Sequence, residues 1–377
     1  MNELPKIKIL HITQVGGGIE TYLEQIVKNI DRQRFDIILA APAYRTSLEK
    51  MATRYEIPFY PIKLKWQISP IHDIISIFSM IKLEKKIKPD IIHAHSSKAG
   101  MIVRLARLFY KSPVVYTPNG FAYLGKTGIK RKIFVAIEKL AIPLTDTLLA
   151  SSVSEKKRCL ADLSFPKNKV EVYPNSIEIL PLPDSPPQLN SKKLVTTVGR
   201  LVNQKNPFMF LNVCKKITDI RDDIFFEIIG AGFEDSLRKG IEKFIEDNNL
   251  CGKIGIIDWM NRSDLLTTIR STDVFVMTSA FESFGYVAAE AQMLEVPVVA
   301  TNVDGLNEIV KDNDTGYLID LNDSTAMAEK ICLLIDNPIE ATEMGKRGRI
   351  RVSDLFSITK NIVILERFYL NKAGKSN

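Results

Sequence analysis

The feature that most constrains the fold is an alternation of strand-like and helix-like segments that runs twice along the chain. Short apolar runs such as "KIKILHIT", "FDIILAAP" and "DIIHAHS" alternate with segments whose apolar residues recur at helical spacing, such as "IETYLEQIVKNI". The runs are apolar throughout rather than at every second position, which is typical of parallel strands covered by helices on both faces. Residues 1–180 are therefore predicted to form a Rossmann-like, doubly wound domain.

The second series of strands and helices follows a proline-rich segment. Residues 181–192 contain four prolines within seven residues, and this composition predicts a linker. Runs such as "KLVTTVGR" and "DVFVMTSA" then predict a second Rossmann-like domain at 193–355, followed by a C-terminal helix at 356–377 that packs back on the first domain. The predicted fold class is α/β, with two doubly wound domains facing across a cleft. Because ligands of such folds bind beyond the carboxyl ends of the strands, the cleft is the expected site.

The composition excludes several other classes of protein. With 45% hydrophobic and 25% charged residues, the chain has the composition of an ordinary globular protein. No apolar run approaches the roughly 20 residues of a membrane span, and the N-terminus leads into a strand without the apolar region of a signal peptide. The four cysteines lie far apart, without metal-binding or redox spacing, as expected of a protein in a reducing cytoplasm.

The charge is divided unevenly between the two halves of the chain. Residues 1–190 carry 28 Lys and Arg against 17 Asp and Glu, a net charge of +11, whereas the remainder carries a net charge of −4. A basic half suits an anionic partner such as a membrane surface or phosphate groups, and it equally suits a solvated basic surface. Nucleic acid is not expected as a partner, because the sequence shows no binding module with stacking aromatic residues or a basic helix-turn-helix.

Two loops that follow predicted strands have the chemistry to bind phosphates. Gly16-Gly17-Gly18 lies between the first strand and the first helix, where a backbone without side chains lets a diphosphate approach a helix N-terminus. Arg200 and Lys205 follow the first strand of the second domain and can hold a diphosphate through charge-assisted hydrogen bonds. Taken singly, these features are also explained by a tight turn and by solvated surface cations.

Two histidines end a predicted strand in the segment "HAHSSKAG". His93 and His95 are two residues apart, so they lie on one face of the strand and a metal-binding pair is conceivable. No nearby cysteine or acidic cluster completes a set of metal ligands, and no metal is expected. The alternatives are contacts to a polar ligand, to which Ser96, Ser97 and Lys98 would add donors, or a capped turn between strand and helix.

The stretch "FESFGYVAAEAQ", residues 281–292, places two carboxylates after a buried strand. Ser283 is a candidate N-cap for the following helix, with backbone amides near Phe284 and Gly285 directed at a ligand. Glu282 would lie just before the helix and Glu290 about two turns into it. Eight helical residues rise about 12 Å, farther than the ~5–10 Å that separates the carboxyls of a glycosidase pair, so two separate contacts to an extended ligand fit better. For Glu282 the alternative is a favourable charge near a helix start.

Together, and in this order, these features resemble the retaining sugar-nucleotide glycosyltransferases of family 4, which have the GT-B fold. The resemblance covers nearly the whole chain and rests on "GGIE", "GRLVNQKN", "ESFGYVAAEAQ" and "PVVATNVDG". The spacing Glu282-x7-Glu290 is the signature of that family, and "HAHSSKAG" resembles the variant in bacterial capsule, O-antigen and exopolysaccharide enzymes. The resemblance implies a cytoplasmic, membrane-associated hexosyltransferase that retains anomeric configuration and needs neither metal nor cofactor.

The resemblance also implies how the donor is held. Gly17 and Gly18 would approach the donor phosphate, and Arg200 and Lys205 would hold the leaving diphosphate. Residues 282–285 would meet the donor sugar. The leaving phosphate oxygen would take the proton of the acceptor, because no side chain is an obvious base.

The nucleotide end of the donor has its own implied contacts. Glu290 would accept hydrogen bonds from the ribose, and Trp259 or Met260 would line the base, with UDP expected rather than GDP. One position departs from the family pattern: many relatives have a histidine facing the donor sugar where this chain has Asn119. Asparagine carries no proton at neutral pH, which argues against an acid–base role there and leaves open whether His95 compensates.

The acceptor, a glycan or a polyprenyl-diphosphate-linked sugar, is expected to bind the basic N-terminal domain. The segment "GKTGIKRKIFVAIEKLAI" combines cations such as Lys130 and Lys132 with Phe134, Val135 and Ile137, and it suits an anionic bilayer or an ordinary packed helix with a basic start. Two other functions share the pattern. A UDP-sugar 2-epimerase would turn over its donor without an acceptor, and a non-catalytic nucleotide-sugar-binding protein would bind without turnover.

Overall fold

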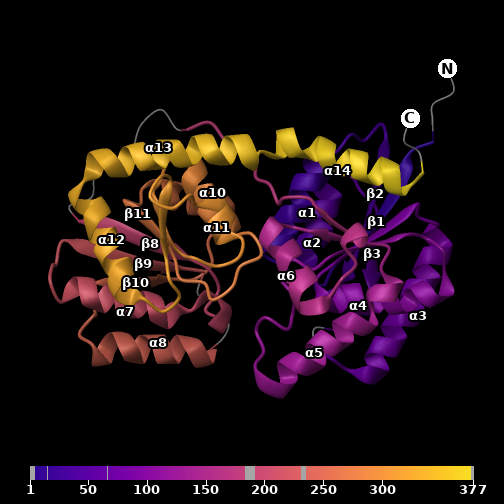
Figure 1. The fold of residues 1–377 in the computed structure, drawn as a ribbon, viewed down its shortest axis with the longest axis horizontal. Helices are drawn as coiled ribbons and strands as arrows, with labels where there is room; N and C mark the ends of the chain where they lie inside the picture. The colour runs from indigo at the N-terminus through magenta and orange to yellow at the C-terminus, as the bar shows by residue number, and fades with distance from the viewer. Residues whose placement is uncertain (1–4, 15, 66, 183–191, 231–234, 375–377) are drawn as a thin grey trace. The chain divides into compact units, whose positions relative to one another are not determined.

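The computed structural model describes residues 5–14, 16–65, 67–182, 192–230 and 235–374, which divide into two compact units. Unit 1 comprises residues 1–178 and 358–377, and unit 2 comprises residues 179–357. Figure 1 shows that each unit is built around its own sheet flanked by helices. Most of the predicted linker at 181–192 lies outside the described residues.

The described part of unit 1 contains one parallel sheet of seven strands. Its order is β3-β2-β1-β4-β5-β6-β7. The strands are β1 (Ile7–Ile12), β2 (Phe35–Pro42), β3 (Phe59–Ile62), β4 (Ile91–His95), β5 (Val114–Thr117), β6 (Thr147–Ala150) and β7 (Val170–Val172). The strand order reverses between β1 and β4, so the carboxyl ends of these two strands flank the point at which open α/β sheets bind ligands.

Helices cover both faces of this sheet. They are α1 (Gly18–Asn29), α2 (Thr46–Arg54), α3 (Pro70–Ile87), α4 (Ser97–Ala106), α5 (Gly128–Leu140), α6 (Val153–Leu163) and α14 (Ile358–Lys372). The inward sides of α3 and α4 share a hydrophobic core with Leu10 and Ile92 of the sheet. Helix α14, from the end of the chain, belongs to unit 1, and its Glu366 accepts a hydrogen bond of 2.8 Å from the backbone amide of Asp31.

The described part of unit 2 contains a parallel sheet of six strands in the order β10-β9-β8-β11-β12-β13. The strands are β8 (Lys193–Val198), β9 (Ile224–Ile229), β10 (Ile254–Ile257), β11 (Val274–Met277), β12 (Val298–Thr301) and β13 (Gly316–Ile319). The helices are α7 (Pro207–Thr218), α8 (Asp235–Asp247), α9 (Arg262–Arg270), α10 (Tyr286–Met293), α11 (Leu306–Ile309), α12 (Ser324–Asp336) and α13 (Pro338–Leu355). The order reverses between β8 and β11, which places the expected binding point of this unit at their carboxyl ends.

The predicted fold class of two doubly wound α/β domains is confirmed within each unit. Two elements of unit 1, α2 and β3, were not predicted. Helix α2 buries only Leu48, Met51 and Ala52, and β3 contains Pro61, so neither produces a clear apolar pattern. Among the described residues, no helix is both long and apolar enough to cross a lipid bilayer.

Candidate active site

The carboxyl ends of β8 and β11 in unit 2 carry a cluster of polar groups. Gly199 and Arg200 follow β8, Thr278 and Ser279 follow β11, and all four line one hollow together with Lys205. The two strands are neighbours in the sheet, which is why loops almost 80 residues apart in sequence meet here. The hollow therefore lies at the switch point of this sheet and has two cations in its lining.

An ion pair joins the two loops of the hollow. The Nζ atom of Lys205 lies 2.5 Å from Oε2 of Glu282, and the side chains are 23% and 11% exposed. The Oγ1 hydroxyl of Thr278 donates to the backbone carbonyl of Lys205 at 2.9 Å. Because an ammonium group has three donors, Lys205 keeps donors for an anion while it contacts Glu282.

The turn before α11 packs closely against the segment 282–285 and positions it. The amide of Gly305 donates to the carbonyl of Glu282 at 2.9 Å. A Cβ atom at Gly305 would lie 2.5 Å from Cα of Phe284 and 2.6 Å from the carbonyl oxygen of Ser283, so only glycine fits. The close approach fixes the loop that the sequence predicts to contact the donor sugar.

The start of α10 differs from the prediction. The helix begins at Tyr286, and Gly285, with φ 102°, is its N-cap. The prediction of Ser283 as the N-cap is wrong, because the left-handed backbone at Gly285 interrupts any earlier turn. Residues 282–285 are therefore not helical, and the 12 Å estimate between Glu282 and Glu290 does not apply. The two carboxylates nonetheless have different partners.

Glu290 is paired with an arginine that the sequence did not single out. Its side chain is 3% exposed, and Oε1 accepts a hydrogen bond of 2.8 Å from Nη2 of Arg262. Burial raises the pKa of the Glu290 carboxyl, and the Arg262 guanidinium opposes that shift. Asn261 caps α9 by accepting a hydrogen bond of 3.0 Å from the amide of Asp264, which fixes Arg262 in the first turn.

The loop before α9 carries the two residues expected to border a base. Trp259 is 78% exposed. Met260 is half-buried, with Sδ 3.9 Å from Oγ1 of Thr268. Arg262 lies two residues after Met260 and contacts Glu290. The exposed indole of Trp259 and the buried carboxylate of Glu290 therefore belong to the same part of unit 2.

The glycines that follow β1 in unit 1 leave a helix start open. Gly17 is the N-cap of α1 with φ 70°, and a Cβ atom there would meet nothing within 4 Å. Gly17 and Gly18 are both exposed. Packing therefore does not explain Gly17, although its positive φ favours glycine, and the predicted approach of a phosphate to the start of α1 stays a prediction.

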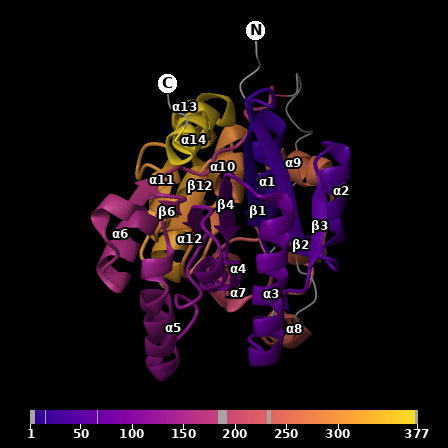
Figure 2. The same cartoon turned by 90° about the vertical axis from the view of Figure 1, so that its right-hand side faces the viewer.

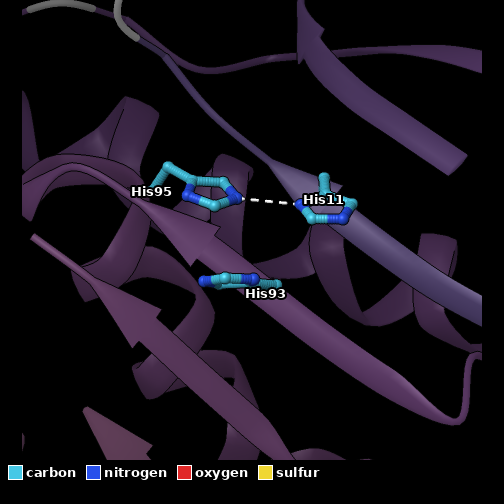
Figure 3. Close-up of side chains that lie close together, drawn as sticks. All are labelled: His11, His93 and His95. Atoms are coloured by element: carbon cyan, nitrogen blue, oxygen red, sulfur yellow. Dashed lines mark hydrogen bonds between the residues drawn. The ribbon is translucent and has the colours of Figure 1, made fainter. Parts of the chain in front are cut away.

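His11, on the neighbouring strand β1, lies close to His93 and His95 (Figure 3). All three rings are fully buried, and Nδ1 of His11 lies 2.9 Å from Nε2 of His95. Burial lowers the pKa of His11 to about 3 and the pKa values of His93 and His95 well below their usual range, so all three are neutral. Being fully buried, His95 reaches no ligand in this conformation.

The hydrogen bonds of His93 connect helix α14 to the strands of the sheet. Its Nε2 lies 2.8 Å from Oγ1 of Thr117, which donates its own proton to the carbonyl of Leu149. The Thr117 oxygen must therefore accept from His93 Nε2–H, which leaves Nδ1 to accept from the Tyr369 hydroxyl at 2.7 Å.

Metal binding would use the same atoms. The three rings offer ligand atoms within 4.8 Å of one another, so His11 supplies a third nitrogen ligand that the sequence did not indicate. Because both nitrogens of His93 are engaged, the arrangement is a hydrogen-bonded anchor for α14.

Asn119 lies beyond the carboxyl end of β5 with a left-handed backbone, φ 50°. Its Oδ1 lies 3.5 Å from Nδ2 of Asn175, and its own Nδ2 is buried with no hydrogen-bond partner among the described residues. Buried amide donors are normally satisfied, so the unpartnered Nδ2 of Asn119 is unusual, as is the unpartnered Nδ1 of the fully buried His95.

Comparison with known proteins identifies the family. Residues 16–179 match the family model described as Glycosyltransferase Family 4, and residues 183–351 match the one described as Glycosyl transferases group 1. Together the two models span nearly the whole chain, with one model on each unit. The chain belongs to the family 4 glycosyltransferases and is therefore a glycosyltransferase, as the sequence motifs predicted.

Individual relatives extend over the full length of the chain. It is 29% identical to a UDP-Gal:alpha-D-GlcNAc-diphosphoundecaprenol alpha-1,3-galactosyltransferase of Escherichia coli, covering 97% of both chains. It is 28% identical to the capsular polysaccharide biosynthesis glycosyltransferase CapM of Staphylococcus aureus, covering 93% of both. Among solved structures, Anabaena Alr3699/HepE in complex with UDP and glucose has a TM-score of 0.82 at 19% identity, covering 96% of this chain and 99% of that one, which shows a shared fold.

Proposed function

We propose that this glycosyltransferase moves a sugar from a UDP-sugar to a glycan or polyprenyl-diphosphate-linked acceptor, with retention of anomeric configuration and without a metal. The reaction would serve the synthesis of a cell-surface polysaccharide such as capsule, O-antigen or exopolysaccharide, at the cytoplasmic side of the membrane. The observation that carries the proposal is the pair Lys205–Glu282 beside Arg200, at the switch point of the unit 2 sheet.

The leaving diphosphate is assigned to Arg200 and Lys205. Both cations line the hollow beyond β8, and Lys205 is oriented by its ion pair with Glu282. Fixed positive groups stabilise the negative charge that develops on the diphosphate as the sugar–phosphate bond breaks. A divalent metal ion can stabilise the same charge in other enzymes. Gly17 and Gly18, which are exposed at the start of α1, are assigned to phosphate binding on the ground of unit 1 alone.

The nucleoside is assigned to α9 and α10. Ionised Glu290 would accept hydrogen bonds from the two ribose hydroxyls, and Arg262 favours the ionised form of this buried carboxylate. The exposed indole of Trp259, with Met260, would stack on or border the base. UDP is favoured because the E. coli relative is named for UDP-Gal and the solved Anabaena structure is a complex with UDP.

The sugar is assigned to Glu282, Ser283 and the amides of Phe284 and Gly285, which Gly305 holds in place. The acceptor hydroxyl attacks the anomeric carbon on the face from which the diphosphate leaves. The hydroxyl proton passes to the departing phosphate oxygen, so no side-chain base is needed. Asn119 would donate its unpaired amide hydrogen to a sugar hydroxyl, and the buried His95 would act only through its neighbours.

The acceptor is assigned to unit 1, the basic part of the chain. The E. coli relative is named for a diphosphoundecaprenol-linked acceptor, and CapM for capsular polysaccharide. A lipid-linked acceptor lies in a membrane, so unit 1 would contact the surface of that membrane.

The test is a thermal-shift screen of UDP- and GDP-sugars followed by turnover with membrane-extracted acceptors. We expect a UDP-sugar to raise the melting temperature and to be consumed only when acceptor is present, with chelator making no difference. Consumption without acceptor would indicate an epimerase, and binding without any turnover would indicate a sensor. Either result would overturn the proposal.

A further inference from the structure

Three helices of unit 1 form a single layer on one face of its sheet. Helices α3 and α4 share the same core with β1 and β4, and a buried ion pair of 2.7 Å between Arg104 and Glu138 joins α4 to α5. Figures 1 and 2 both show α4 between α3 and α5. The outward sides of the three helices, called here the α3–α5 layer, therefore form one surface of unit 1.

Helix α3 turns a stripe of large apolar side chains outward. Ile71, Ile74 and Phe78 are 73%, 55% and 59% exposed, and Ile75 lies beside them at 42%. Their spacing of three and four residues places them on one side of the helix. A helix that covers a sheet ordinarily buries its one apolar stripe. Here α3 buries a different set of apolar residues, including Met80, so the outward stripe has no packing role within the unit.

Helix α5 repeats the pattern. Ile129, Ile133 and Leu140 are 70%, 51% and 79% exposed, again at helical spacing. Of the apolar residues that the sequence pointed to in this segment, Phe134 and Val135 pack against the core that contains Tyr116 and Phe121, whereas Ile137 is 38% exposed. Ile133 directly precedes Phe134 in the sequence, and because successive residues of a helix point in different directions, the first faces outward and the second faces the core.

The short 3-10 helix η1 (Arg107–Phe109), which directly follows α4, adds to the same kind of surface. Leu108 and Phe109 are 65% and 60% exposed. All three parts of the layer thus expose several large apolar side chains. Several exposed large apolar side chains on neighbouring elements mark an interaction site more often than isolated ones do.

Exposed lysines lie beside the exposed apolar side chains of α3 and α5. Lys82 and Lys85 follow Phe78 on the outward side of α3, and Lys130 and Lys132 alternate with the isoleucines of α5. The carboxylates of the layer are largely occupied: Asp73 pairs with Lys98 at 2.5 Å, and Glu138 pairs with Arg104. The surface therefore combines apolar side chains with an excess of positive charge.

We propose that the α3–α5 layer docks on an anionic lipid bilayer, an inference that rests on the proposed lipid-linked acceptor. Apolar side chains flanked by lysines insert into the boundary between headgroups and acyl chains, while the lysines contact lipid phosphates. A second copy of this chain fits less well. In a symmetric dimer the same patch faces itself, so the lysines would oppose one another.

The experiment measures co-sedimentation with vesicles of phosphatidylcholine containing increasing phosphatidylglycerol. Binding of the wild-type protein should rise with the anionic fraction and fall with added salt. The variants Ile74→Ser/Phe78→Ser and Lys130→Glu/Lys132→Glu should each lower the partition coefficient about tenfold or more. Matched controls in unit 2 are Ile339→Ser, at a side chain 82% exposed, and Lys243→Glu, at an exposed lysine of α8, and both should bind as wild type does.

Three readouts separate the outcomes. Binding that stays flat as phosphatidylglycerol is added overturns the inference, as does a dimer in sedimentation velocity that Ile74→Ser/Phe78→Ser disperses. Thermal shift with UDP-sugars reports on the donor site independently, so vesicle binding can fail while donor binding persists, and the reverse. Thermal melts of the ligand-free variants confirm that they are folded.

Discussion

Replacing Lys205 by alanine tests whether the cation beyond β8 stabilises the leaving diphosphate. The Lys205 ammonium lines the hollow and lies 2.5 Å from the Glu282 carboxylate, so its position is fixed before substrate binds. Removing one preorganised group that stabilises developing charge costs about 10²- to 10³-fold in kcat. We expect Lys205→Ala to lower kcat by about two to three orders of magnitude, with a smaller change in KM.

The same substitution has a cost in folding stability that must be measured separately. It leaves Glu282, 11% exposed, without its ion-pair partner, and loss of such a bond destabilises by about 1–3 kcal/mol. Lys193→Ala is the matched control. Lys193 begins β8, the strand that precedes Lys205, and its Nζ lies 3.1 Å from Oδ1 of Asp273, with both side chains 34% exposed. That exposed pair contributes about 0–1 kcal/mol, and its loss should leave turnover unchanged.

The assay is UDP release at saturating donor and acceptor, with urea denaturation of each variant to obtain its free energy of unfolding. If folded Lys205→Ala turned over within threefold of wild type, the assignment of Lys205 to the diphosphate would be refuted. If Lys193→Ala lost as much activity as Lys205→Ala, the loss would reflect a disturbance of β8 rather than a lost contact to the diphosphate.

Three further predictions concern the supports of the site. Arg262→Ala removes the group that opposes the effect of burial on Glu290, so the pKa of this carboxyl should rise further. The UDP affinity of this variant should be lower than that of wild type and should recover as the pH is raised in calorimetric titrations; a loss independent of pH would contradict this. Gly305→Ala forces a Cβ atom to 2.5 Å from the backbone of Phe284; it should cost about 1–3 kcal/mol in urea denaturation and lower kcat. Tyr369→Phe removes the hydroxyl that donates to His93; it should destabilise unit 1 by about 1–3 kcal/mol without changing UDP affinity, and an unchanged melting curve would refute the anchoring role.

Much of the fold could be predicted because parallel strands buried on both faces are apolar throughout. The run "DVFVMTSA" contains β11, whose four residues are all buried. Elements that bury little, such as α2, gave no such pattern. The sequence did not indicate which side of α5 faces outward, because its isoleucines and its inward Phe134 are equally apolar. Hydrophobicity alone does not distinguish two apolar sides of one helix.

The site was predictable where a local motif carries the chemistry. Glu282 and Glu290 stand out by their spacing, and Gly17 by its place between strand and helix. The partners of these residues come from other elements, and the order of strands in the sheet is not encoded in any local pattern. Arg262, 28 residues before Glu290, therefore went unrecognised, as did the contact of His11 with His95.

The most direct test of the central claim is the anomeric configuration of the product, followed by NMR while wild-type enzyme consumes a UDP-sugar in the presence of its acceptor. The account predicts that the first product formed keeps the configuration of the donor and that UDP appears in equal amount. An inverted product, or donor consumed at the same rate without acceptor, would contradict it.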